Sequence, residues 1–488
     1  MTLTQALNTA QAIFNNTGKQ SSVVSNNIAN ASNPDYTRRQ AMTTISSDGA
    51  TVVQIARSAE PTLQRQLLSS TSADAAQQRL LTGYGDIQAT IGGNDSETAP
   101  STYLSNFRKA IQAFAAAPNS NTTAQAAVTA AQDVANSLNQ STAAVQQVRT
   151  DADKEIATTV TSLNDLLKQF QTTNDAVRTA TASGADPSNA LDQRDGVLKQ
   201  ISSIVGIKTV NRANGDMALY TSDGATLFET VPRDVTFVPT NGYSAGSTGN
   251  GVYIDGVALA PGDGANTTAK GTLQALLQIR DVAAPTYQKQ LDEIGRGLVT
   301  MFSETNTVDG SKLPGLFTYT DANGNPGETP TSSTTIDGMA AAITVNPAVI
   351  TSAGGNPNLL RDGGINGTDY ISNLAGDAGY STRLDALDTA MGTPMDFDPN
   401  AGVDSNSSIM DFASNSVGWV ESARSAASTA AENTAASSSR SSEAYSNGTG
   451  VNLDEELTLM MDIEQSYKAG TKILSAVNDM LTALLQLN

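Results

Sequence analysis

One short motif in the chain has the spacing of a serine nucleophile. Gly242-Tyr243-Ser244-Ala245-Gly246 matches the G-x-S-x-G nucleophile elbow of hydrolases. That elbow needs a strand before the serine, a helix after it and a histidine base elsewhere in the chain. The motif lies instead in a run of Gly, Ser and Asn between expected strands, and the chain contains 0 histidines. We therefore interpret Ser244 as part of a surface loop.

A second motif has the spacing of calcium ligands. Residues 321–325, Asp-Ala-Asn-Gly-Asn, resemble the start of an EF-hand loop. Such a loop requires glycine at its sixth position and glutamate at its twelfth, where this chain has Pro326 and Ser332. The chain also has 0 cysteines, which excludes thiolate metal sites. The sequence therefore predicts a turn here, and we expect no catalytic, cofactor-binding or metal-binding residue and no enzyme activity.

Charge and hydropathy restrict the partners. The 488 residues include 28 Lys+Arg and 48 Asp+Glu, a net charge of −20. Nucleic acids and anionic membranes attract basic protein surface, so neither is expected as the main partner. No apolar run approaches the length of a transmembrane helix, so we expect no membrane insertion. The first basic residue is Lys19, which argues against a cleaved secretory signal peptide.

The elements that could position functional side chains begin with a helix over residues 2–28. Its stripe alternates spacings of four and three, which is the repeat of a coiled-coil seam. Thr17 and Ser21 make the stripe polar in its middle, and Gly18 costs about 1 kcal/mol relative to Ala. The helix is expected to need a partner, although the pattern also fits an ordinary amphipathic core helix. The stripe consists of Leu3, Leu7, Ala10, Phe14, Thr17, Ser21, Val24 and Ile28.

The last 36 residues carry a matching pattern. Asn452 is expected to cap this helix, and Asp454, Glu455 and Glu456 suit the positive end of its dipole. Further apolar residues widen the face beyond one seam, and so wide a face is usually buried against more than one neighbour. The two terminal helices are expected to pair with each other or with copies of themselves. The seam consists of Met460, Ile463, Tyr467, Gly470, Leu474, Val477, Leu481 and Leu484.

Between these ends, periodicity predicts helices around a β-rich middle. Residues 58–204, 270–305 and 404–446 follow helical spacing, whereas 206–260 contain short β-branched runs between turn residues. Aromatic residues are only 5% of the chain, which favours thin packing over one large core. The predicted fold class is mainly α, with long helices, paired terminal coiled-coil helices, a β module and a small inserted α/β or β domain. The molecule is expected to be elongated and multidomain.

Three domains are predicted, in agreement with the length of the chain. A terminal helical domain combines residues 1–33 with 453–488. A long helical rod domain combines residues 34–310 with 402–452 and carries the β module at about 206–262. An inserted outer domain covers residues 315–400, which are rich in Gly, Pro, Thr and Asn.

The first helix is followed by a distinctive string. Residues 25–39 are Ser-Asn-Asn-Ile-Ala-Asn-Ala-Ser-Asn-Pro-Asp-Tyr-Thr-Arg-Arg. Asn tolerates left-handed backbone and Pro34 cannot continue a helix, so the helix is expected to stop near Asn30, with Tyr36 and Arg38 on the exit loop. The string resembles the N-terminal signature of flagellar rod, hook and hook-associated proteins. It departs from that signature at Asn33, Asp35 and Arg39, where Thr, Gly and Gln are usual.

Other segments resemble the same flagellar axial family. Residues 450–456 and 464–469 resemble its closing helix. In rod and hook proteins β structure follows soon after the first helix, whereas here about 140 helical residues are expected. Asn164, the string Leu191-Asp192-Gln193-Arg194-Asp195 and, in altered form, residues 308–317 resemble the hook-associated members that join hook to filament.

This resemblance implies an extracellular structural protein of the bacterial flagellum, exported by the flagellar type III route. Paired terminal helices form the inner tube in such proteins, which implies self-association in a ring at the hook–filament junction. The implied partners are the hook protein, the second hook-associated protein and a cytosolic export chaperone on the C-terminal helix. Two alternatives stay open: another axial component, or a secreted coiled-coil adhesin or tip protein.

The expected assembly interface combines the two seams with the signature string. Its residues are Leu3, Leu7, Ala10, Phe14, Val24, Asn26, Asn27, Ile28, Asn30, Tyr36, Arg38, Met460, Ile463, Tyr467, Leu474, Val477, Leu481 and Leu484.

Overall fold

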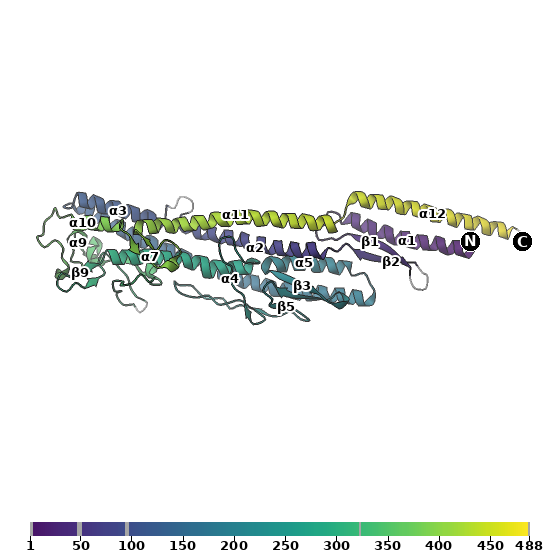
Figure 1. The fold of residues 1–488 in the computed structure, drawn as a ribbon, viewed down its shortest axis with the longest axis horizontal. Coiled ribbons are helices and arrows are strands. Elements are labelled where there is room, and N and C mark those ends of the chain that lie inside the picture. The colour runs from purple at the N-terminus through teal and green to yellow at the C-terminus, as the bar shows by residue number, and fades with distance from the viewer. Residues whose placement is uncertain (1–2, 46–50, 93–96, 322–323, 487–488) are drawn as a thin grey trace.

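The computed structural model describes residues 3–45, 51–92, 97–321 and 324–486. The molecule is long and thin, and both termini lie at the same end (Figure 1). We call residues 3–57 and 453–486 at this end the terminal region, and the remainder the rod. Across the described ranges, no helix has both the length and the apolar character needed to cross a membrane.

Two helices, the terminal pair, lie side by side in the terminal region: α1 (Leu3–Ala29) and α12 (Leu453–Leu485). α1 ends near Asn30, as predicted. Asn452 caps α12, also as predicted, because its Oδ1 accepts a hydrogen bond from the backbone N–H of Asp454 at 3.0 Å. The paired terminal helices of the predicted fold class are therefore confirmed.

A β-hairpin that the sequence analysis did not predict follows α1 directly. β1 (Arg39–Ile45) pairs antiparallel with β2 (Thr51–Arg57). The expectation that helices follow the first helix without intervening β structure is therefore wrong, whereas the long helical region itself is present between Pro61 and Ile204. The hairpin packs on α1 through one face, where Val53 is buried, and its other face is exposed at Met42. So few inward-facing residues give only a weak alternating pattern in the sequence.

Long helices that pack along one axis build the rod (Figure 1). The longest stretch is α4, whose 63 residues begin after the N-cap Ser120 and end at Gly184, which adopts a left-handed conformation with φ 70°. A π-helical turn over 279–283 joins α6 to α7. The rod helices are α2 (Pro61–Ala89), α3 (Pro100–Ala116), α4 (Asn121–Ser183), α5 (Ser188–Ile204), α6 (Thr272–Gln278), α7 (Ala284–Met301) and α11 (Ile409–Thr449).

The predicted β module lies on the side of the rod and forms two antiparallel sheets. The first has the order β3–β4–β5 and the second the order β6–β7–β8. Asp255 and Gly256 form the tight turn between β7 and β8, both with positive φ, which matches the right-handed twist of a hairpin. The strands are β3 (Ile207–Asn211), β4 (Met217–Thr221), β5 (Thr226–Phe228), β6 (Val235–Thr236), β7 (Tyr253–Ile254) and β8 (Val257–Ala258).

Short strands and helices form the far end of the rod. Phe317 of this part contacts Phe107 and Phe302, with ring centroids 5.6 and 5.4 Å away, so the far end shares the core of the rod helices. Its elements are β9 (Glu304–Thr305), β10 (Lys312–Leu313), β11 (Phe317–Thr318), α8 (Met339–Ala342), β12 (Thr344–Val345), α9 (Leu359–Asp362), α10 (Thr382–Met391), β13 (Met395–Asp396) and β14 (Asn406–Ser407).

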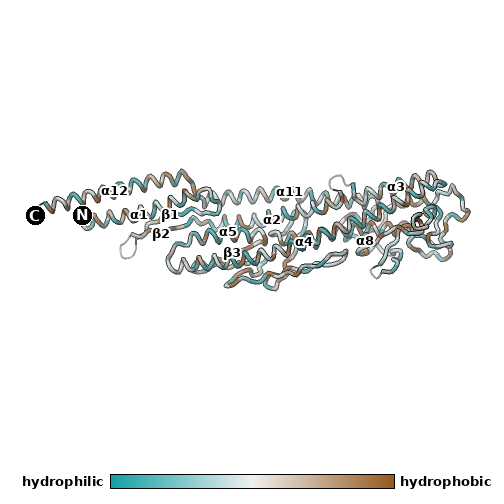
Figure 2. The backbone as a smooth tube through the Cα atoms, turned by 180° about the vertical axis from the view of Figure 1, so that it is seen from behind, coloured by the Kyte–Doolittle hydropathy of each residue, from teal (hydrophilic) through white to brown (hydrophobic). Residues whose placement is uncertain are grey.

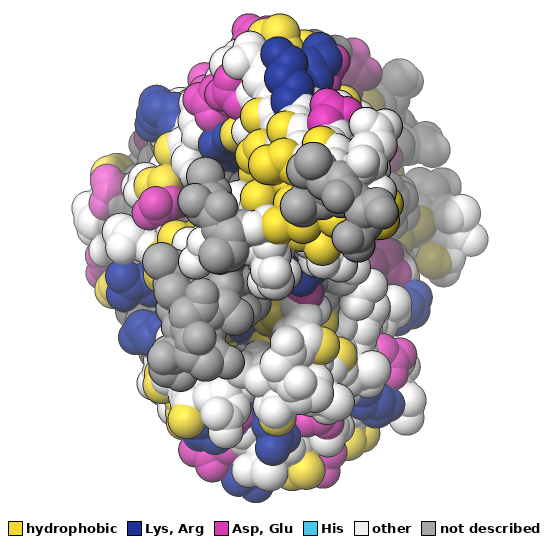
Figure 3. Space-filling model, turned by 90° about the vertical axis from the view of Figure 1, so that its right-hand side faces the viewer, with side chains coloured by type: hydrophobic (Ala, Val, Ile, Leu, Met, Phe, Trp, Pro, Cys, Tyr) yellow, Lys and Arg dark blue, Asp and Glu magenta, His cyan; other side chains and the backbone are white. Residues whose placement is uncertain are grey.

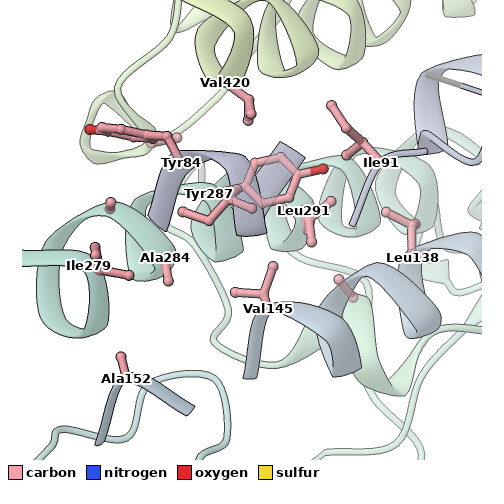
Figure 4. Close-up of a cluster of buried hydrophobic side chains, with 14 of the residues drawn as sticks. Tyr84, Ile91, Leu138, Val145, Ala152, Ile279, Ala284, Tyr287, Leu291 and Val420 are labelled. Atoms are coloured by element: carbon pink, nitrogen blue, oxygen red, sulfur yellow. The ribbon is translucent and has the colours of Figure 1, made fainter. Parts of the chain in front are cut away.

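A continuous hydrophobic core runs through the rod. Figure 4 shows part of it, where Tyr84, Val145, Tyr287, Leu291 and Val420 gather in one cluster from α2, α4, α7 and α11. Each of these side chains is buried. The hydrophobic stretches along α12, by contrast, continue out to the end of the molecule, beyond the rod (Figure 2). The two regions therefore use their apolar residues differently.

Candidate assembly interface

On the inner face of α1, a buried residue recurs every seven positions. Ala10, Thr17 and Val24 are buried. The hydroxyl of Thr17 donates a hydrogen bond to the carbonyl of Ile13 at 2.8 Å, so this polar residue on the stripe is satisfied within its own helix. The other predicted stripe residues lie at the edges of this face: Leu3, Phe14, Ser21 and Ile28 are half-buried and Leu7 is exposed.

The inner face of α12 has the same spacing. Ile463, Gly470 and Val477 are buried, and Met460 is half-buried. Gly470 allows close approach, because an added Cβ would lie 3.0 Å from Cγ2 of Ile13. Across the same contact, the rings of Phe14 and Tyr467 meet edge to face with centroids 5.1 Å apart. The predicted seams thus pair with each other.

Much of the predicted α12 stripe is nevertheless uncovered. Tyr467 is 51% exposed, and Leu474 and Leu481 are each 41% exposed. Leu453 lies on the same side of the seam, while Leu459 and Met480 lie on its other side and are also exposed. We call these six residues the apolar flanks of α12. Viewed from this end, hydrophobic side chains gather on the surface (Figure 3). The side chain of Leu484 lies outside the described residues.

The two helices are also joined at their base by a buried amide. Asn27 is fully buried, and its Nδ2 donates to the carbonyl of Arg39 at 2.8 Å and to Oε2 of Glu456 at 3.0 Å. Its Oδ1 accepts from the Tyr36 hydroxyl at 2.8 Å and from the Arg39 backbone N–H at 3.1 Å. The amide therefore uses both donors and both acceptor positions. Burial raises the pKa of Tyr36, and the neighbouring Arg39 cation opposes this shift.

Arg38 completes this contact from the exit loop. Its Nε donates to Oε1 of Glu456 at 2.7 Å, and its Nη1 lies 2.8 Å from Oε2 of Glu455. Its backbone N–H donates to the carbonyl of Thr449 at 2.8 Å. The sequence analysis interpreted these acidic residues as partners of the helix dipole. The structure gives Glu456, which is fully buried, a different role, because it binds Arg38 and Asn27.

Two predicted interface residues do not join the helices. Asn26 is exposed, and Asn30 donates its side-chain amide to the carbonyl of Asn26 at 2.9 Å, which stabilises the end of α1. Both instead line a polar cleft of about 810 Å³ toward α4 and α5, together with residues such as Gln169 and Asn189. The Asn30 side chain therefore serves the helix end rather than the seam.

The motifs with possible chemistry lie in loops. Ser244 lies between β6 and β7 without the strand–turn–helix context of a nucleophile elbow, and its carbonyl accepts a hydrogen bond from Arg149. Oδ1 of Asp321 accepts from the backbone N–H of Asn325 at 2.8 Å, which is a turn contact. Residues 322–323 of that motif lie outside the described residues. Within the described ranges, no group of three or more acidic side chains could hold a metal ion.

Sequence reasoning missed the contacts between the hairpin and the rod. Arg39 and Arg57 each bind Asp192 of α5. The string around Asp192 was noticed only for its resemblance to other proteins. The sequence does show Arg residues in one segment and Asp residues in the other. Nothing in it, however, indicates that these two segments, about 150 residues apart, lie side by side.

The fold and this site define a class of elongated helical proteins that pair their first and last helices. The family model "Flagellar hook-associated protein FlgK helical domain" matches residues 86–343, and "Flagellar basal body rod FlgEFG protein C-terminal" matches residues 442–487. The first match covers more than half of the chain. The chain therefore belongs to the flagellar hook-associated protein family, whose members are structural proteins of the flagellum.

Individual proteins are also similar to this chain. Flagellar hook-associated protein 1 of Bacillus subtilis (strain 168) is 22% identical over 413 residues, which are 78% of this chain and 75% of that protein. The protein of the same name from Salmonella typhimurium is 26% identical over 336 residues, 64% of this chain and 57% of that protein. The flagellar hook junction protein FlgK from Burkholderia pseudomallei is 20% identical, with a TM-score of 0.42 over 54% of this chain and 46% of that chain.

Proposed function

We propose that this chain joins the hook to the filament of the bacterial flagellum, as a ring of copies that associate through the terminal pair. The observation that carries the proposal is the exposure of the apolar flanks of α12 on both sides of a seam that α1 already occupies. Each Å² of apolar surface left in water forgoes about 25 cal/mol of stabilisation. Contiguous exposed apolar surface of this kind marks an interaction site.

The exposed flanks and the family of the chain support the following partners. Neighbouring copies cover them around the ring, with the hook protein on one side of the ring and the second hook-associated protein on the other. Before assembly, the same flanks need protection, which favours an export chaperone on α12 in the cytosol. The subunit reaches its extracellular place through the flagellar exporter. In this arrangement residues 1–33 and 453–488 form the inner part, 34–310 and 402–452 the rod, and 315–400 the outer domain.

Two changes to α12 test this function in cells that carry no other copy of the gene. Deletion of residues 453–488 should leave a soluble rod that no longer attaches filaments to hooks, because the rod core lies outside the deleted segment. The finer variant, Leu474→Ser with Leu481→Ser, should reduce filament attachment while α1 stays paired through Ile463 and Val477. Electron microscopy then counts hooks without filaments.

The matched control is Ser475→Ala with Thr482→Ala, at adjacent exposed positions of the same helix. It should keep normal filaments, because it removes no apolar surface. Normal filaments in the Leu474→Ser, Leu481→Ser strain at normal protein levels would contradict the proposal. Loss of filaments in both strains would show that any change on α12 prevents assembly. That result would also contradict a specific role of the apolar flanks in filament attachment.

A further inference from the structure

The string Leu191-Asp192-Gln193-Arg194-Asp195 lies on α5, near the end of the rod that meets the terminal region. Asp192 and Asp195 are one helical turn apart, so their side chains share a face of α5. Arg194, between them in sequence, turns elsewhere and donates to Oδ1 of Asn174 at 2.9 Å. The two carboxylates instead contact the hairpin.

The two carboxylates bind two guanidinium groups at the open end of the hairpin, where β1 begins and β2 ends. Nη2 of Arg39 lies 2.9 Å from Oδ2 of Asp192, and Nε of Arg57 lies 2.8 Å from Oδ1 of the same carboxylate. Nη2 of Arg57 also lies 2.6 Å from Oδ2 of Asp195. The four side chains are between 9% and 16% exposed, so water screens these pairs weakly. We call these four residues the clamp.

Within the clamp, the two Arg cations would repel each other without the carboxylates. Arg39 lies directly opposite Arg57 in the hairpin register, and like charges at such positions destabilise a strand pair. Asp192 lies between them and uses one oxygen for each guanidinium. Burial lowers the pKa of Arg57, but Asp195 and Asp192 more than offset this and keep the side chain cationic. Asp192 is therefore the residue that allows the two cations to be buried together.

The clamp adds a further connection between the terminal region and the rod, which the main chain joins at only two places. The chain crosses between terminal region and rod at 58–60, from β2 to α2, and at 450–452, from α11 to α12. Two short crossings allow rotation about the line that joins them. α5 has no covalent crossing here, and it packs against α2 beneath α11 in Figure 1. An attachment through α5 removes that rotation.

We propose that Asp192 and Asp195 are positioning residues that hold the hairpin on α5 and thereby set the direction of the terminal pair relative to the rod. Its consequence for assembly rests on the proposed function, because every subunit of a ring must present α1 and α12 at the same angle. Arg39, which stands where Gln is usual in the resembling signature, supplies the second cation and makes the carboxylate of Asp192 indispensable in this chain.

The experiment measures this direction on the free, full-length subunit. The chain has 0 cysteines, so Thr179→Cys on α4 and Ser466→Cys on α12 give one spin-labelled pair at two exposed positions. Pulsed electron paramagnetic resonance should give a single narrow distance. Asp192→Asn should replace it with a broad distribution at unchanged helix content by circular dichroism. Adding Arg39→Gln to Asp192→Asn should narrow the distribution again, because only one buried guanidinium remains and Asp195 still binds it.

Asp165→Asn is the matched control, since Asp165 pairs with Lys168 on the exposed surface of α4 and should leave the distance unchanged. An unchanged distance in Asp192→Asn would overturn the proposal. So would equal broadening in the control, or a double variant as broad as Asp192→Asn alone. Because the distance is read on the free subunit, failure of the proposed junction function would leave this result as it is.

Discussion

The rod and the terminal region bury their apolar residues to different extents. In the rod, large side chains such as Phe107, Phe170 and Tyr287 are fully buried by helices of the same chain. In the terminal region, Tyr467 and Leu474 lie on α12 with about half of their surface in water. The rod therefore completes its core within one chain, whereas the terminal pair leaves part of its apolar surface uncovered.

The two regions also differ in where they place polar contacts. The seam of the terminal pair is apolar along most of its length and polar at its base, where Asn27 binds Glu456. A buried amide in a helix pair costs stability but specifies register, since only one alignment satisfies it. Small and half-exposed side chains specify the register of a helix pair only weakly, so the polar contact adds most of the specificity. The base of the pair thus sets its alignment, and the apolar flanks take no part in this polar contact.

The largest expected difference between the regions is in amide hydrogen exchange of the free subunit. Helices α1 and α12 should exchange faster than α4 and α7 by roughly a thousandfold or more, because a partly covered helix pair opens at a lower free energy than core helices, which open only on global unfolding. Exchange measured by mass spectrometry resolves both regions in one sample. Protection of residues 3–28 and 457–485 equal to that of α4 would show that the terminal pair is already complete.

A smaller difference is expected between two phenylalanine truncations. Phe107→Ala removes a buried ring that contacts Phe302 and Phe317, and should destabilise the rod by about 3–5 kcal/mol. Phe14→Ala removes a half-buried ring that contacts Tyr467, and should change the same unfolding transition by less than about 1 kcal/mol. Urea unfolding followed by circular dichroism measures both. Similar shifts would mean that the two regions unfold as one unit.

Local signals predicted much of the fold. Asn452 caps α12 because a side-chain oxygen accepts from the first free N–H groups, a rule that needs only neighbouring residues. The seven-residue recurrence of Ala10 and Val24, and of Ile463 and Val477, correctly predicted which faces are buried. The width of the apolar face on α12 predicted that one partner would not cover it.

The hairpin and the clamp could not be predicted in this way. The hairpin has few buried residues, so its alternation is weak, and its stability comes from packing on α1. The clamp joins Arg39 to Asp192 across about 150 residues of chain, and such a contact depends on how α5 and the hairpin are placed by the whole fold. Glu456 was likewise assigned to the helix dipole, because its partner Arg38 is distant in sequence.

Two buried carboxylates extend the comparison of the regions. Glu456 in the terminal region binds the cation of Arg38. Asp292 in the rod is also fully buried, but it accepts from neutral donors: the backbone N–H groups of Gly338 at 3.1 Å and Ala340 at 2.9 Å, and the amide of Gln288 at 3.2 Å. Burial raises the pKa of Asp292 to about 7, and these hydrogen bonds only partly oppose the shift.

A smaller effect than that of Phe107→Ala should come from Asp292→Asn in the rod. A folded pKa of about 7, above the ordinary value of 3.8 for an aspartic acid, means that the folded state binds the proton more tightly. Stability of the wild type should therefore fall as pH rises through this window. The variant loses one hydrogen-bond acceptor and should be less stable than the wild type at pH 5 by about 1–3 kcal/mol. Because its stability should depend less on pH, the difference in stability between the two proteins should become smaller toward pH 8. Urea unfolding measures the stability of both proteins at pH 5 and pH 8. The same stability difference between wild type and Asp292→Asn at both pH values would contradict this account. Asp165→Asn serves as the exposed control.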